Sequence, residues 1–312
     1  MIAVLGEALI DFIAGKDHNG QSCFFYYNGG CALNSATAAA RLDSDVVYIG
    51  KLSADIFGVQ MKEHFKANNV VLLPHLCDVS QNSMIGFATL DAKGSASYTF
   101  YIDGTTVTSL SAEEIVAALD QMPEVHYLHI GSVAVALEES GSQILQALNN
   151  LENPPFIFFD PNVRPTIISD FASYRHRFLE LVKKSDLLKL SHEDLALLFP
   201  SLKEAEALNL LLEMGLPHIV LTMGADGLRW LTQDGLDLFV PAIDSLVVDT
   251  VGAGDTVSGA LLNYLEENGI GKGDPIEEEE ITEALEFAAA AADITVSRKG
   301  ADPPYRSELS SF

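Results

Sequence analysis

The sequence predicts an α/β fold, with a doubly wound, mostly parallel sheet and a small β-sheet lid. Along most of the chain, short apolar or β-branched runs alternate with helical patterns, which is typical of such sheets. Residues 12–29 and 80–107 instead show short alternating strands, with turn signals at His18-Asn19-Gly20 and Asp91-Ala92-Lys93-Gly94. Since 48% of the 312 residues are hydrophobic, residues 1–312 can form one domain, with these two segments as its lid.

The elements are expected in regular succession. The predicted main-sheet strands are Ile2–Leu5, Val46–Ile49, His126–Ile130, Phe156–Phe159, Leu187–Leu190, His218–Thr222 and Val247–Val248. Helical patterns such as Ala32–Leu42 and Ala112–Leu119 separate them. The acidic run Glu277–Glu280 predicts the start of a helix over Ile281–Ala292, because negative charge is favourable at a helix N-terminus. In open α/β sheets ligands bind beyond the carboxyl ends of the strands, so a site is expected there.

The charge of the chain excludes some classes of partner. Its 44 acidic and 18 basic residues give a net charge of −26, which argues against binding to nucleic acid or to an anionic membrane surface. A bound nucleotide must then be held by helix N-termini, a divalent cation and a few basic side chains. The acidity indicates either a solvated, soluble surface or adaptation to a salty environment.

The N-terminal segment and the cysteines indicate a cytoplasmic protein. The segment after Met1 lacks a basic region and contains Glu7 and Asp11, so it does not resemble a signal peptide, and no apolar run is long enough to cross a bilayer. Cys23, Cys31 and Cys77 are odd in number and lack both CxxC spacing and a zinc-type His cluster. We expect reduced, structural thiols.

The most informative segment is Val247–Leu262, which reads VVDTVGAGDTVSGALL and predicts a strand, a tight turn and a helix. Gly252 and Gly254 allow the backbone to curve closely around a ligand, towards which the helix directs its unpaired N–H groups. Such a turn is an anion site, and it contains a carboxylate, Asp255. The alternative is that Asp255 is an ordinary helix N-cap.

The same residues resemble the C-terminal signature of the ribokinase-like (PfkB) sugar kinases, D-T-x-G-A-G-D-x-x-x-G-A. The resemblance implies that Asp255 removes the proton from the sugar hydroxyl that is phosphorylated. It also implies that the N–H groups from Gly252, Ala253 and Gly254 to Asp255 form the anion hole for the transferring phosphoryl group. Phosphoryl transfer needs chiefly positioning and charge stabilisation, which a base and an anion hole in one turn supply.

Further segments carry the resemblance to the sugar site. They are the G-E-x-x-I-D pattern that ends at Asp11, the Asn28–Asn34 signature, SYTFY at Ser97–Tyr101, and D-P-N-x-R-P at Asp160–Pro165, which is typical of fructokinases and 2-keto-3-deoxygluconate kinases. The sugar-binding residues implied are Asp11, Gly29, Gly30, Asn34, Tyr101 and Asn162, and Arg164 is assigned to catalysis because it can direct a rigid fork of donors at hydroxyls or phosphate. Plain turns and helix caps are the alternatives for the glycines and for Asp55, a further candidate.

The resemblance also implies a nucleotide site. Thr222, Gly224 and Gly227 match a T-x-G-x-x-G loop for ATP, Lys189 is assigned to the same cofactor, and Ala288–Gly300 resembles the border of an adenine pocket. Ser191 and Asp194 occupy the terminal positions of an N-x-x-E motif, and Asp194 and the neighbouring Glu193 are expected to organise Mg²⁺ through water. A monovalent cation such as K⁺ is a further possible ligand.

Taken together, the sequence predicts an ATP-dependent sugar kinase, most similar to fructokinases, that converts D-fructose to fructose 6-phosphate. The alternatives are a 2-keto-3-deoxygluconate kinase, an aminoimidazole riboside or nucleoside kinase, and, in a different class, a noncatalytic sugar or nucleotide sensor. The expected partners are small molecules, with a homodimer through the lid as a further possibility that the resemblance raises.

Overall fold

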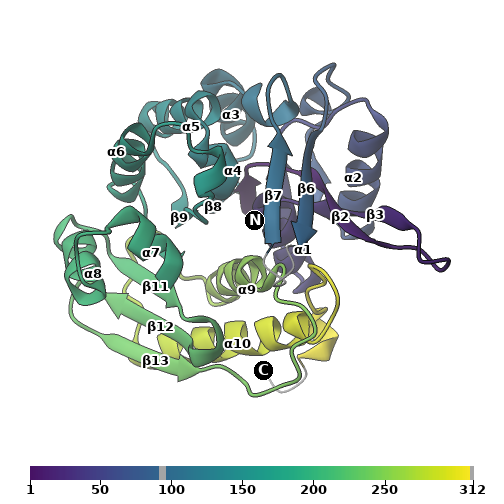
Figure 1. The fold of residues 1–312 in the computed structure, drawn as a ribbon. Coiled ribbons are helices and arrows are strands. Elements are labelled where there is room, and N and C mark those ends of the chain that lie inside the picture. Colours follow the sequence, from purple (N-terminus) through teal and green to yellow (C-terminus); the bar gives the residue numbers. More distant parts are fainter. Residues whose placement is uncertain (91–95, 310–312) are drawn as a thin grey trace.

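The computed structural model describes residues 1–90 and 96–309, so the turn expected at Asp91–Gly94 lies outside the described residues (Figure 1). Within them, the main sheet has nine strands in the order β13-β12-β11-β10-β9-β8-β1-β4-β5. Their bounds are β1 Ile2–Leu5, β4 Val46–Ile49, β5 Val71–Leu72, β8 Tyr127–Gly131, β9 Phe156–Asp160, β10 Leu187–Ser191, β11 His218–Thr222, β12 Gly227–Thr232 and β13 Asp237–Pro241. Neighbouring strands from β5 to β11 are parallel, and β12 and β13 extend the sheet in antiparallel fashion. The predicted sheet is therefore confirmed.

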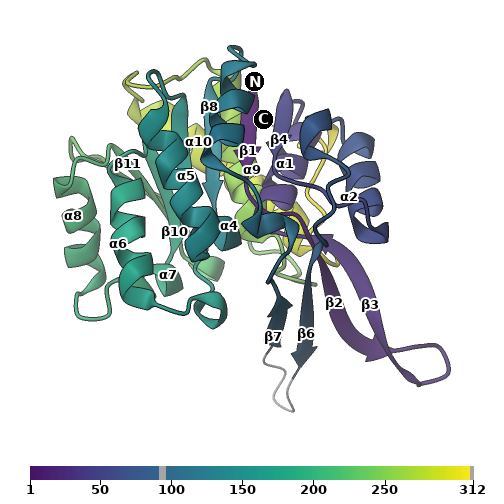
Figure 2. The same cartoon turned by 90° about the horizontal axis from the view of Figure 1, so that it is seen from above.

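Helices cover both faces of this sheet (Figures 1 and 2). Alternate residues of β1 point to opposite faces, as strand geometry requires: Ile2 and Val4 belong to one hydrophobic core, and Ala3 and Leu5 to the other. The first core includes α1 (Cys31–Arg41), α2 (Ile56–Ala67), α9 (Ala253–Glu267) and α10 (Glu278–Val296). The second includes α3 (Ala112–Asp120), α4 (Ser132–Ala136), α5 (Glu138–Asn150), α6 (Phe171–Val182), α7 (His192–Leu198) and α8 (Glu204–Glu213).

The lid is a separate four-stranded sheet that projects from the body (Figure 2). Its strands are β2 (Leu9–Lys16), β3 (Ser22–Gly29), β6 (Met84–Leu90) and β7 (Ala96–Tyr101), in the order β3-β2-β6-β7. The expected turn between β2 and β3 is present: Asp17 Oδ1 accepts hydrogen bonds from the backbone N–H groups of Asn19 (2.9 Å) and Gln21 (2.8 Å), and Gly20 has a φ of 77°.

One predicted strand is wrong. Val247 and Val248 are not in a strand but in an exposed connection, where their side chains are 58% and 55% exposed. The hairpin β12–β13, which was not predicted, already completes this edge of the sheet. The connection passes instead across the end of α10, where the backbone N–H groups of Val248 and Asp249 donate to the Val296 carbonyl oxygen at 2.7 and 3.1 Å.

The predicted helix starts are confirmed with small shifts. In α10, Glu277 is the N-cap and forms a capping box with Glu280. Among the helices described, none combines the length and apolar character needed to span a bilayer.

Candidate active site

The N-terminus of α9 forms a turn that only glycine fits. Gly252 is the N-cap, with a left-handed φ of 79°, and a Cβ there would lie 2.8 Å from Ala301 Cα. The first α-helical bond runs from Thr256 N to Gly252 O at 2.8 Å, so the N–H groups of Gly254 and Asp255 precede it. These N–H groups and the positive end of the helix dipole make the turn suitable for an anion.

Asp255 lies in this first turn and is 8% exposed. It is not the helix N-cap, because Gly252 holds that position; this alternative is wrong. Asn34 Nδ2 donates a 2.7 Å hydrogen bond to Asp255 Oδ2, and the Cys31 thiol also donates to the carboxylate. Burial raises the pKa of Asp255 above its ordinary value and Asp160 adds to this, although the two hydrogen bonds and Lys189 act in the opposite direction. A carboxylate with a raised pKa is suited to accept a proton near neutral pH.

A buried ion pair lies beside this turn. Lys189 Nζ contacts Asp160 Oδ2 at 2.5 Å, and Ser258 Oγ donates to the same oxygen at 3.1 Å. A Cβ on Gly254 would be 3.8 Å from Lys189 Nζ, so the ammonium group lies close to the predicted anion hole. Burial favours a lower pKa for Lys189, but the charge of Asp160 and the hydrogen bond to it prevail and raise the pKa. Lys189 therefore stays charged beside the place expected for phosphate.

Asp11 is held in β2 between two glycines. A Cβ on Gly29 of β3 would overlap Asp11 Oδ2, and a Cβ on Gly86 of β6 would lie 2.9 Å from Oδ1. Burial raises the pKa of Asp11 to about 6, Arg164 lowers it and Asp255 raises it. The lid carboxylate, Arg164 and Asp255 are thus near enough to affect one another. The sequence did not single out Gly86, because its pairing with Asp11 depends on strand register.

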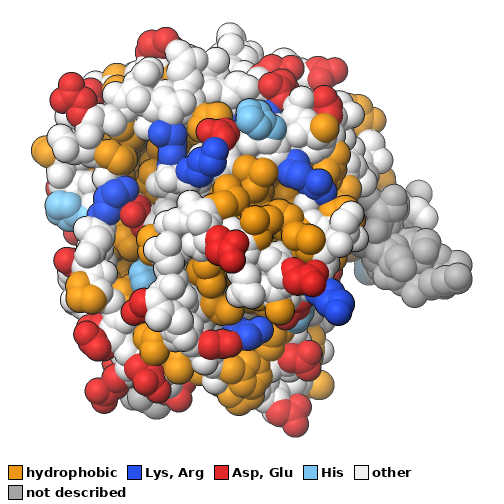
Figure 3. All heavy atoms as spheres, turned by 90° about the vertical axis from the view of Figure 1, so that its left-hand side faces the viewer, with side chains coloured by type: hydrophobic (Ala, Val, Ile, Leu, Met, Phe, Trp, Pro, Cys, Tyr) orange, Lys and Arg blue, Asp and Glu red, His pale blue; other side chains and the backbone are white. Residues whose placement is uncertain are grey.

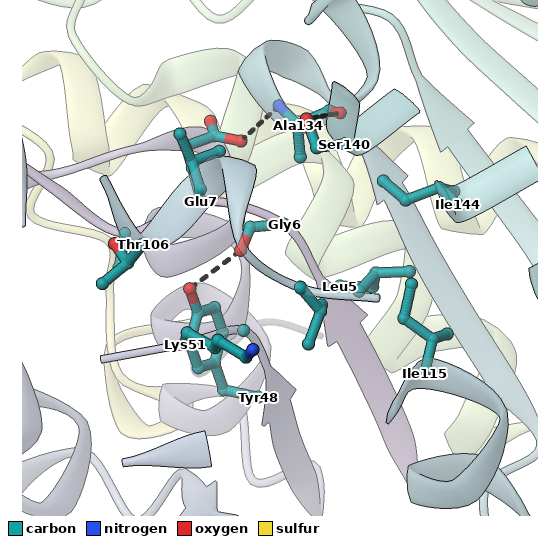
Figure 4. A pocket seen from close by; sticks show the side chains of 14 residues that line it. Leu5, Gly6, Glu7, Tyr48, Lys51, Thr106, Ile115, Ala134, Ser140 and Ile144 are labelled. Atoms are coloured by element: carbon teal, nitrogen blue, oxygen red, sulfur yellow. Dashed lines mark hydrogen bonds between the residues drawn. The ribbon is translucent and has the colours of Figure 1, made fainter. Parts of the chain in front are cut away.

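Glu7 is a further buried residue beside the site that the sequence did not identify. It is 1% exposed, and its Oε1 accepts from Cys31 N at 3.0 Å. Its Oε2 accepts from Ala134 N at 3.2 Å (Figure 4). It therefore joins the N-termini of α1 and α4. Gly30, the N-cap of α1, has a φ of 99°, and a Cβ there would lie 2.7 Å from the Glu7 carbonyl oxygen. Only the G-E-x-x-I-D pattern pointed to this position.

Three of the four residues assigned to the nucleotide line one cavity, and Lys189 is not part of its lining. Its volume is about 530 Å³, and Thr222, Gly224 and Gly227 line one part of it. Gly254 borders it, so the cavity reaches the first turn of α9. The remaining wall is largely apolar and includes Val247, Val257, Ala289, Ala292 and Val296. An apolar cavity that ends at unpaired N–H groups fits a base at one end and phosphates at the other.

The proposed magnesium residues lie in a different arrangement from the one expected. Asp194 is buried and its carboxylate is already engaged: Oδ1 accepts from Val163 N at 2.7 Å, and Oδ2 from Ser191 N and Oγ at 3.0 and 2.9 Å. Glu193 is exposed. Asp194 thus caps α7 and fixes the loop after β9, and a water-mediated metal role stays a prediction.

The remaining candidates are more peripheral. Tyr101, at the end of β7, is 59% exposed and meets the Phe87 ring edge-on. Asn162 has a left-handed φ of 37° in the loop that leads to the exposed Arg164. Asp55 caps α2 and accepts from Gly58 N at 2.8 Å and Ser83 N at 2.7 Å, which gives it a structural role. The three cysteines are free thiols.

Known proteins share both this sequence pattern and this fold. The pfkB family carbohydrate kinase profile matches residues 1–308. Fructokinase of Rhizobium leguminosarum bv. trifolii is 33% identical over 267 residues, which cover 85% of this chain and 79% of that protein. Fructokinase from Xylella fastidiosa with bound ATP superposes with a TM-score of 0.88 at 24% identity, over 99% of this chain and 97% of the other. Fructokinase from Vibrio cholerae O395, in its fructose-, ADP- and calcium-bound form, has a TM-score of 0.84 at 25% identity, over 100% and 98%. The chain belongs to the pfkB family of carbohydrate kinases.

Proposed function

We propose that this sugar kinase transfers the γ-phosphate of ATP to a primary hydroxyl of a neutral sugar, D-fructose, and forms fructose 6-phosphate. The observation that carries the proposal is the buried Asp255 with its raised pKa, in the same turn as the unpaired N–H groups of α9. The curated relatives named fructokinase support the choice of sugar.

In the proposed mechanism, Asp255 accepts the proton of the sugar hydroxyl as its oxygen attacks the γ-phosphorus and ADP leaves. Asn34 and Cys31 hold the Asp255 carboxylate in place. The N–H groups at the start of α9 and the Lys189 ammonium stabilise the charge on the phosphoryl oxygens. Asp11 accepts hydrogen bonds from other sugar hydroxyls, which fixes the orientation of the sugar under the lid.

Magnesium is expected to screen the triphosphate charge when it is bound. The hydrogen bonds on both Asp194 oxygens do not fit a direct metal ligand, so we derive no step through that residue.

Charge near the lid favours a neutral sugar over a sugar acid. A cavity of about 610 Å³ beside the end of β7 is lined by Asp103, Glu138, Glu139 and Asp170, with Arg177 as its basic residue. That guanidinium is already paired with Glu138 at 2.6 Å. A carboxylate placed in this cavity would be repelled, although the residues assigned to the sugar, with Arg164 beside Asp11, lie outside its lining.

The test is a panel of sugars assayed with ATP and magnesium, on the parent protein and on Asp255→Asn. Fructose should be the preferred substrate, and Asp255→Asn should lower turnover by about 10²–10⁴-fold, the usual contribution of a general base. Asp43→Asn, an exposed carboxylate outside the site, is the matched control and should retain activity. Preference for 2-keto-3-deoxygluconate or for a riboside would replace the substrate. Absence of turnover with every sugar, or full activity in Asp255→Asn, would refute the mechanism and favour the noncatalytic sensor.

A further inference from the structure

A second polar cluster lies next to the catalytic base. It consists of Cys31 at the start of α1, His129 in β8 and Asp160 at the end of β9, and we call it the Cys31–His129–Asp160 cluster. The thiol, one ring nitrogen and one carboxylate oxygen all lie within 4.8 Å of one another. The three residues are only 5%, 1% and 1% exposed.

His129 has no hydrogen-bond partner that would explain its place in this cluster. Neither of its ring nitrogens has one among residues 1–90 and 96–309. A neutral imidazole carries one donor and one acceptor, and leaving both buried and unsatisfied costs about 1–3 kcal/mol for each group. A ligand between His129 and its two neighbours would remove this cost.

Asp160 retains a free position for such a ligand. The hydrogen bonds described for it, from Lys189 and Ser258, both end on Oδ2. Oδ1 can therefore accept a further partner without breaking the ion pair with Lys189.

The local charges balance for a divalent cation. Lys189 opposes a cation, but carboxylates lie close to Cys31: Asp160 is in the cluster, Glu7 Oε1 accepts from Cys31 N at 3.0 Å, and the Cys31 thiol donates to Asp255. A divalent cation and Lys189 bring three positive charges, and the Cys31 thiolate, Asp160 and Asp255 bring three negative ones. These groups then sum to zero, and Glu7 adds one negative charge when it is ionised.

We propose that the Cys31–His129–Asp160 cluster is an inhibitory binding site for a thiophilic divalent cation, with Zn²⁺ as the best fit. Sulfur, imidazole nitrogen and carboxylate oxygen are the zinc ligands of proteins, at about 2.3, 2.0–2.1 and 2.0–2.2 Å, in tetrahedral geometry. Ligand atoms at such distances stand about 3.5 Å apart, so small side-chain rotations close the site. Magnesium, which prefers oxygen ligands, is not expected to compete.

Binding inhibits because it changes Cys31. The cation displaces the thiol proton to solvent, one proton for each ion, and the resulting thiolate no longer donates a hydrogen bond to Asp255. The catalytic carboxylate then loses one of its two side-chain donors, and the cation also engages Asp160, whose Oδ2 holds Lys189 beside the anion hole. The sequence concealed this site because its ligands are 98 and 31 residues apart along the chain, at positions 31, 129 and 160.

Metal binding is tested on the full-length reduced protein without nucleotide, since ATP itself binds metals. Zn²⁺ is titrated in competition with a chromophoric chelator, and Co²⁺ is used as a probe because its thiolate complex absorbs in the near ultraviolet. We expect one ion and one released proton per chain, with the thiolate band. Cys31→Ser should abolish the band and weaken Zn²⁺ binding at least tenfold, and His129→Gln should weaken it similarly.

Matched controls separate this cluster from the other thiols and imidazoles. Cys77→Ser and the exposed His126→Gln should bind Zn²⁺ as the parent does. If Cys31→Ser does not fold, the X-ray absorption spectrum of the zinc-loaded parent decides, because the site requires one Zn–S distance of about 2.3 Å. The proposal would be overturned if the parent bound Zn²⁺ no more tightly than Cys31→Ser does, or if the Co²⁺–thiolate band were lost in Cys77→Ser. An X-ray absorption spectrum without a Zn–S distance would also overturn it.

Inhibition is measured separately. Zn²⁺ added before magnesium and ATP should abolish sugar phosphorylation in the parent and in Cys77→Ser, with recovery on chelation, and His129→Gln should need at least tenfold more Zn²⁺. Zn²⁺ binding without loss of sugar phosphorylation would overturn the claim that the site is inhibitory. Because the binding measurements need no sugar, their result does not depend on the proposed substrate.

Discussion

At the scale of single residues, the environment of the lid carboxylate explains both its position and its acidity. The Asp11 carboxylate points between Gly29 and Gly86. A side chain at either glycine would come too close to the carboxylate oxygens. The same enclosure removes water from the carboxylate and raises its pKa to about 6. In the proposed function Asp11 binds hydroxyls as an anion, so sugar binding should depend on pH near 6.

The first prediction concerns pH. Because the folded pKa of Asp11 is raised, the group is ionised above about pH 6 and protonated below it. KM for the sugar should rise as pH falls through 6, by about tenfold for each pH unit below it. The measurement is KM and kcat from pH 5 to 8, with Asp11→Asn as the comparison, whose KM should be high and insensitive to pH. A parent KM that stays constant down to pH 5 would contradict this assignment.

The second prediction concerns Gly86, which has no charge or hydrogen-bonding side chain. In Gly86→Ala, the added Cβ would lie 2.9 Å from Asp11 Oδ1 and 2.8 Å from Phe100 Cε1, so the carboxylate must shift. KM for the sugar should rise at least about tenfold, as expected when one charged hydrogen bond of about 1.5–3 kcal/mol is weakened. Gly271→Ala, at a partly exposed position with an ordinary φ and away from Asp11, is the control. Unchanged KM in Gly86→Ala would place the sugar elsewhere.

At the scale of elements, the site depends on how helix N-termini are joined. Glu7 follows β1 and holds the starts of α1 and α4 at once, while α1 supplies Asn34 and Cys31 to the Asp255 carboxylate. Helix α9 reaches α1 because Gly259 has no side chain: a Cβ there would lie 2.6 Å from Ala38 Cβ. The separation of base and binding residues is therefore set by helix packing.

The third prediction follows from the burial of Glu7, which raises its pKa from 4.5 to about 7. A group with a raised folded pKa stabilises fully below its unfolded pKa, and that stability is lost as pH rises through about 7. At about 1.4 kcal/mol per pH unit, the loss is about 3 kcal/mol. The measurement is the free energy of unfolding in urea, for the parent and for Glu7→Gln, at pH 5 and 8. The difference in this free energy between parent and variant should be smaller at pH 8 by about 3 kcal/mol. A pH-independent difference would show that Glu7 keeps one charge state.

At the scale of the whole molecule, the chain carries a large excess of acidic residues. In the face shown in Figure 3, Asp and Glu side chains are distributed among Lys and Arg rather than gathered into one patch. With a net charge of −26, self-repulsion acts across the entire fold. The solvated-surface and salt-adaptation interpretations differ in how strongly added salt, which screens this repulsion, should stabilise the fold.

The fourth prediction tests salt adaptation. Raising NaCl from about 0.1 to 1 M shortens the Debye length from about 10 to 3 Å and screens the repulsion. The unfolding temperature should rise by roughly 2–4 °C for each kcal/mol of repulsion removed. Calorimetry with NaCl and with choline chloride should give the same rise, because screening does not depend on the cation. An unfolding temperature indifferent to salt would leave only the solvated-surface interpretation.

The sequence by itself determined the main strands, the lid segments and the Asp255 turn, because periodicity, turn residues and the glycine-rich signature all act between near neighbours in the chain. It failed at Val247–Val248, where β-branched residues cross the end of α10 instead of joining the sheet. Only the tertiary structure decided which groups meet. Asn34 bonds to Asp255 across 221 residues, Gly86 faces Asp11 by strand register, and Cys31 meets His129 and Asp160 under α9. Such contacts depend on how sheets and helices pack, and that packing brings together residues far apart along the chain, so no short segment of sequence predicts it.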